Sequence, residues 1–111
     1  MNYEAMSDDE INYEVAKHSF DEAWLERHYG KEGMLPDYCG NWGDAGPVIL
    51  ENKISMCTHL LGDGSWSAKH DVVVLRQENG TIMVHSFTSN NKNPLRAAMV
   101  VFLMIKDNQN D

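Results

Sequence analysis

The most informative segment of the chain reads NPLRAAMVVFLMI and spans residues 93–105. Asn93 is a favourable helix N-cap and Pro94 suits a first helical position, so a closing helix is predicted over about 94–106. Apart from Arg96, this helix is apolar on nearly every side, which is typical of a helix that is buried or shared between subunits. A sheet covers only about half of a helix surface. The other apolar side must therefore be covered by a second helix or by a second copy of the chain, and we expect a homo-oligomer.

The residues before this helix predict a three-stranded, mainly antiparallel sheet. Apolar and polar positions alternate in the first predicted strand, and glycine-containing turns separate the strands. The predicted strands span residues 53–61, 66–77 and 81–88.

Asn79-Gly80 is a strong hairpin signal between the second and third strands. A two-residue loop there pairs Val74 with His85 and Val72 with Phe87. Both faces of this hairpin are then apolar enough to need a cover. The sequence therefore predicts helices on both faces of the sheet.

Helices are also predicted in the first half of the chain. Ser7-Asp8-Asp9-Glu10 has the pattern of a capping box and predicts a helix over about 8–19. The segment 20–35 is polar and predicts an appendage. Asp44 is predicted to cap a short helix that ends near Asn52. Together these elements predict one α+β domain over residues 1–111, an α-β-α sandwich.

Charge and composition exclude several functions. The net charge of −8 repels nucleic-acid phosphates, so general nucleic-acid binding is not expected. The longest apolar run, residues 97–105, is too short to cross a bilayer, and the acidic N-terminus is unlike a secretory signal. We expect a protein of the cytoplasm. Cys39, Cys57 and the five histidines lack the spacing of a metal site, so no metal or cofactor is expected.

Three blocks carry a resemblance to a known family. They are the N-terminal capping-box segment 7–12, the central block YCGNWGDAGPVILENKIS at 38–55, and the closing block NPLRAAMVVFLM at 93–104. The chain resembles the NinX-like family of small phage and prophage proteins, and the order of the blocks is similar to a broader group of phage α-β-α sandwich proteins. The resemblance implies a phage accessory gene, so that the expected location is the cytoplasm of the infected bacterial host, and it supplies no catalytic residues. Gly46 stands where relatives tend to carry tryptophan.

Two loops are candidate ligand sites. The first candidate is a helix start that favours an anion, with Arg96 one turn inside. The second is an aromatic loop bounded by glycines, which suits stacking on a base or docking on a protein. The candidate residues are Asn90, Asn91, Lys92, Asn93 and Arg96 in the first loop and helix, and Tyr38, Asn41 and Trp42 in the second. Each also has a structural interpretation: Asn93 and Pro94 simply start a helix, Arg96 pairs with an acidic neighbour, and the aromatics close the core.

No catalytic motif occurs, so the first hypothesis is a non-enzymatic binding protein. In that hypothesis the protein counters host defence by sequestering a small anionic nucleotide. The second hypothesis is an inhibitor or adaptor that binds a host defence protein through its acidic surface. The third is a small enzyme that acts on a nucleotide.

Overall fold

The computed structural model describes residues 2–20, 22–28, 36–58, 64–76 and 81–109 and has the predicted α+β class. Its elements are η1 (Tyr3–Ala5), α1 (Asp8–Ala16), α2 (Glu22–His28), α3 (Trp42–Glu51), β1 (Ser55–Thr58), β2 (Trp66–Arg76), β3 (Thr81–Asn91) and α4 (Pro94–Gln109). The prediction of three strands and a closing helix is confirmed. Two predicted bounds are wrong: β3 continues past residue 88 to Asn91, so that Asn90 and Asn91 belong to a strand, and α1 ends at Ala16 instead of residue 19.

The three strands form an antiparallel sheet in the order β1-β2-β3. The predicted hairpin register is wrong by two residues: Val72 pairs with His85, and Val74 with Met83. The loop at Asn79-Gly80 lies outside the described residues. A shift of two keeps the same positions on each face, so the apolar pattern of the sequence is equally consistent with both registers.

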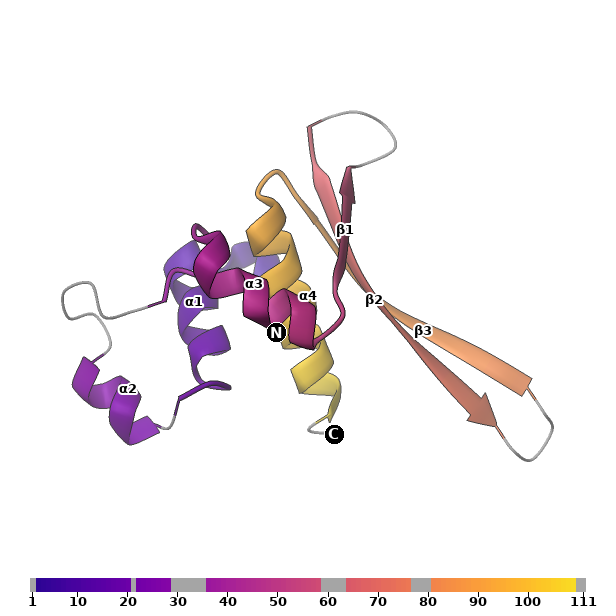
Figure 1. Ribbon diagram of the computed structural model, residues 1–111, viewed down its shortest axis with the longest axis horizontal. Helices are drawn as coiled ribbons and strands as arrows, with labels where there is room; N and C mark the ends of the chain where they lie inside the picture. Colours follow the sequence, from indigo (N-terminus) through magenta and orange to yellow (C-terminus); the bar gives the residue numbers. More distant parts are fainter. Residues whose placement is uncertain (1, 21, 29–35, 59–63, 77–80, 110–111) are drawn as a thin grey trace.

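The helices are stacked in two layers on one side of the sheet (Figure 1). Helix α4 packs across the sheet, and α1 and α3 pack on the opposite side of α4. The short helix α2 lies at the edge of the molecule, away from the sheet (Figure 1). A helix on the second face of the sheet is not seen among the described residues, so that part of the expectation stays a prediction.

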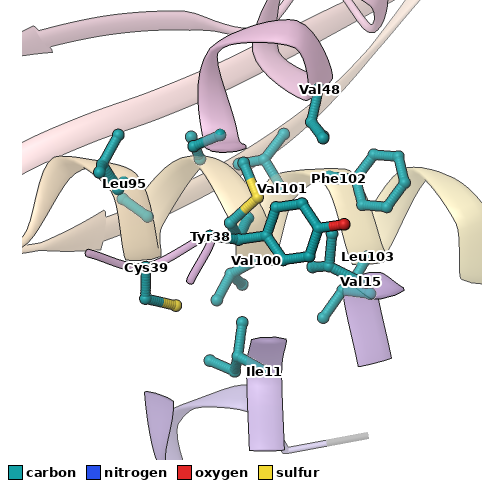
Figure 2. Close-up of a cluster of buried hydrophobic side chains, with 14 of the residues drawn as sticks. Ile11, Val15, Tyr38, Cys39, Val48, Leu95, Val100, Val101, Phe102 and Leu103 are labelled. Carbon is teal, nitrogen blue, oxygen red and sulfur yellow. The ribbon is translucent and has the colours of Figure 1, made fainter. Parts of the chain in front are cut away.

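The core is built around α4, whose residues from Ala97 to Leu103 are all buried. Figure 2 shows side chains of α4, among them Val100 and Leu103, close to Ile11 and Val15 of α1. The second cover of α4 is thus a pair of helices from the same chain. In the described part of the chain, no helix has the length and apolar character needed to span a membrane.

Local signals explain where the helices begin and end. Ser7 and Glu10 form the predicted capping box, with backbone-to-side-chain distances of 3.1 and 3.2 Å. The N-cap predicted at Asp44 is wrong, because Asn41 caps α3 by accepting from the Gly43 amide at 2.7 Å. Helix α3 ends at Glu51 with Asn52 as its C-cap, and Lys53 just beyond adopts the left-handed conformation with φ of 53°.

Candidate functional site

The two loops predicted as ligand sites meet in the structure. The side-chain amide of Asn93 donates to the carbonyl of Cys39 at 2.6 Å. This bond joins the loop before α3 to the loop between β3 and α4. The sequence assigned the two loops separately, and the fold places them together at one corner of the molecule.

The loop before α3 is held in place by a buried asparagine of α1. Asn12 is 7% exposed, and its side chain donates to Asp37 at 3.0 Å and accepts from the Cys39 amide at 2.9 Å. Asp44 accepts from the Asp37 amide at 2.9 Å. At Gly40 an added Cβ would collide with the Asp37 carboxylate, which would have to move from its position beside Asn12. The loop is therefore a fixed part of the fold.

The start of α4 is already capped by the protein itself. The side-chain oxygen of Asn93 accepts from the amides of Leu95 and Arg96 at 3.0 and 3.3 Å. The Asn91 side chain in turn accepts from the Asn93 amide at 2.9 Å. Two of the amides that an anion would use thus already have partners. This agrees with the structural interpretation, in which Asn93 and Pro94 simply start a helix.

The guanidinium of Arg96 is directed into the protein and ties the N-terminal segment to α4. Its side chain is 12% exposed, and Nη1 lies 2.6 Å from the Asp8 carboxylate. Nη2 donates to the carbonyls of Tyr3, at 3.0 Å, and Met6. With these three acceptors and its low exposure, Arg96 has a structural role and presents little free surface to a phosphate.

The remaining predicted residues differ in exposure. Tyr38 is buried, and burial raises the pKa of its hydroxyl. Asn41, Lys92 and Asn90 are exposed, and Trp42 is 57% exposed. Trp42 is therefore the one candidate aromatic side chain that is available to a partner.

Trp42 begins an apolar surface that continues along α3. Trp42, Gly46 and Leu50 are four residues apart and lie on the same side of the helix, and the exposed Pro47 lies beside them. We call these four residues the α3 outer face. Leu50 is 78% exposed, and an atom added at Gly46 would find nothing within 4 Å. The α3 outer face thus has a gap between two large apolar side chains and contains no charged residue.

A separate hollow of about 320 Å³ lies beside β3. Its described lining comprises Tyr3, Glu4, Thr88, Ser89, Asn90, Val100 and Met104. This lining includes a carboxylate and no lysine or arginine. The hollow can therefore offer hydrogen bonds to a ligand through Asn90, and its described lining contains no cation for a phosphate.

The described residues show no arrangement suited to nucleophilic or metal chemistry. Cys39 is 1% exposed, and burial raises the pKa of its thiol to about 12, so it stays protonated near neutral pH. Asp71 lies exposed on the sheet, where the hydrogen bond from Ser86 lowers its pKa. Within the described residues no group of three His, Cys, Asp or Glu side chains is placed to hold a metal ion.

A family model described as "Bacteriophage P22, NinX" matches residues 2–106. The chain belongs to the NinX family. This match confirms the resemblance noted in the three sequence blocks, and it extends over nearly the whole chain. No curated protein and no solved structure gives a significant match.

Two features of this NinX-family chain were missed by the sequence analysis. Asn12 falls among the buried residues Ile11, Val15 and Ala16 of α1, and a polar residue at such a position was the available signal. The exposure of Leu50 has no comparable signal, because Leu50 continues an apolar run that also contains the buried Val48.

Proposed function

We propose that this NinX-family chain is a non-enzymatic phage accessory protein that binds and inhibits a host protein, with host defence proteins as the expected class. The observation that carries this proposal is the α3 outer face. Exposed tryptophan is enriched at the centres of protein interfaces, where its large, rigid side chain contributes much of the binding energy. Trp42 at 57% and Leu50 at 78% exposure flank the gap over Gly46. This gap fits one apolar side chain of a partner.

The charge of the chain indicates which partner surface fits. The net charge is −8, and Glu51 is exposed next to Leu50. Opposite charge around an interface speeds association and excludes wrong partners. The partner therefore presents an apolar side chain within a basic surface. An acidic partner would be repelled.

The test is affinity capture from host-cell lysate, followed by titration of the captured and purified protein. Gly46→Glu and Leu50→Glu each place a carboxylate on the α3 outer face, and both positions are open enough to leave the fold intact. Thr58→Glu is the matched control, because it adds the same charge at an exposed position of β1. We expect at least a hundredfold weaker binding for the two α3 variants and less than a threefold change for Thr58→Glu. Equal affinities for all three variants would refute the proposal.

Sequestration of a small anionic nucleotide is the second candidate function. The observation that favours it is the hollow beside β3, where Asn90 and Ser89 offer hydrogen-bonding groups. Arg96 and the first amides of α4 have partners within the protein, so they support this function less than the sequence suggested. Calorimetric titration with linear and cyclic nucleotides separates the two candidates. Absence of heat with every nucleotide would reject sequestration and leave the protein-binding proposal unaffected.

A further inference from the structure

β3 is a long outer strand, and its free edge lacks the residues that usually prevent pairing with another chain. β3 is an outer strand of eleven residues, whereas the other outer strand, β1, has four. Natural proteins guard such edges with charged residues, proline or short strands. β3 contains no Asp, Glu, Lys, Arg or Pro, although charged residues make up 23% of the chain. Its open edge is therefore suited to pairing with another strand.

The far half of β3 also extends beyond the rest of the protein. Figure 1 shows β2 and β3 continuing as a two-stranded arm past the end of the helical layers. The radius of gyration is 15.5 Å, against about 13 Å for a compact domain of this length. The sequence of the arm is largely apolar, with VVVL at 72–75 and IMV at 82–84. A two-stranded ribbon is only marginally stable in water by itself, so pairing with another strand would stabilise the arm.

We propose that β3 pairs antiparallel with β3 of a second copy of this chain, around a twofold axis near Ser86. The two sheets then form one continuous sheet of six strands. Identical antiparallel strands are self-complementary, as a closed dimer requires. This inference is independent of the α3 outer face and of the proposed function.

The twofold pairing brings the helices of each copy to the arm of the other. With Ser86 at the axis, residues 81–85 of the second copy lie opposite residues 87–91, the half of β3 that is closer to the helices (Figure 1). Ser89 pairs with the buried Ala68 and is therefore on the α4 side of the sheet. The Met83 position of the second copy then lies opposite Ser89, beside the hollow that Val100 and Met104 line. The pairing thus brings the α4 side of each copy next to the arm of the other copy.

Electrostatics favour this edge over the acidic groove on α1 for self-association. Two copies that each carry a net charge of −8 repel each other, and the repulsion is strongest where carboxylates come close. On α1, the groove lined by Met6 and Tyr13 also has Asp9, Glu10 and Glu14 in its wall. A second copy would face those carboxylates there, whereas β3 contributes no charge.

The test is the molar mass by light scattering, combined with lysine substitutions on each outer strand. Ser86→Lys with Asn90→Lys guards the edge of β3 and places two lysines face to face at the axis. Both positions are exposed. Their neighbours on β2, Asp71 and Ser67, are compatible with a lysine side chain beside them. Cys57→Lys with Thr58→Lys is the matched control on β1, where both residues are also exposed.

We expect wild type and the β1 variant to give twice the monomer mass of 12.6 kDa at micromolar concentration. The β3 variant should dissociate at least tenfold more readily, with an unchanged unfolding midpoint when measured as a monomer. Hydrogen exchange at β3 should be slower in concentrated than in dilute wild-type protein. A wild-type monomer at all concentrations, or equal dissociation of the two variants, would overturn the proposal.

Discussion

Replacing Arg96 with alanine should destabilise the fold by about 2–4 kcal/mol. The guanidinium makes two hydrogen bonds to main-chain carbonyls, those of Tyr3 and Met6, and an ion pair with Asp8. A hydrogen bond that involves a charged group contributes about 1.5–3 kcal/mol. The Asp8 carboxylate is 55% exposed, so the ion pair adds little beyond the two carbonyl bonds. Water can bond to the two freed carbonyls, so the loss of unfolding free energy is smaller than the sum of the individual bonds.

The assay is urea denaturation followed by circular dichroism, with the slope checked for equality between variants. Asp8→Asn is the control, because removal of an exposed carboxylate should cost only about 0–1 kcal/mol. A midpoint for Arg96→Ala equivalent to less than about 0.5 kcal/mol of destabilisation would refute the structural role of Arg96. If Arg96 instead served a phosphate, the variant would keep its stability and lose nucleotide binding.

Three further substitutions and one thiol titration test other parts of the fold. Phe102→Ala should lose about 3–5 kcal/mol in the same assay, because Phe102 is 4% exposed in the core, and an unchanged midpoint would show that α4 is peripheral. Asn93→Ala should lose about 1–2 kcal/mol through the lost helix cap, and a loss below about 0.3 kcal/mol would contradict the capping geometry. Lys53→Gly should gain about 0.5–1 kcal/mol, because Lys53 has a positive φ, and a lower melting temperature would contradict this. Thiol titration at neutral pH should find Cys57 reactive and Cys39 protected until urea unfolds the chain, so two fast thiols would contradict the burial of Cys39.

The starts of α1 and α4 were predictable because their signals are local. The capping box at Ser7 and the cap at Asn93 each depend on residues within three positions of one another. The start of α3 was misplaced because Asn41 and Asp44 are both good caps. The backbone of the Asp37–Asn41 turn selects Asn41, and Asp44 bonds back to Asp37 instead.

The arrangement of layers was not predictable from the apolar pattern. The pattern showed that both the hairpin and α4 need covers, but the same pattern fits helices on the far side of the sheet or on α4. The structure places α1 and α3 on α4. The oligomer was predicted because one apolar side of α4 needed a cover, and α1 and α3 provide that cover. The free edge of β3 gives a different reason to expect an oligomer.

The candidate site was predicted in part. The two loops were both singled out, and their contact through Asn93 and Cys39 depends on residues 54 positions apart. The ion pair of Arg96 joins residues 88 positions apart, so its partner was visible only as an unspecified acidic neighbour. Which side of α3 remains open follows from tertiary packing, and only the structure identifies Leu50 as exposed.

The α3 outer face can be tested most directly by photo-crosslinking in infected cells. A photoreactive amino acid at Glu51 lies at the rim of this face, and the same residue at Lys69, exposed on the sheet, is the matched control. We predict one discrete adduct with a host protein from position 51, none from position 69, and loss of the adduct when Leu50→Glu is added. An adduct that persists with Leu50→Glu, or that forms equally from both positions, would contradict a binding role for the α3 outer face.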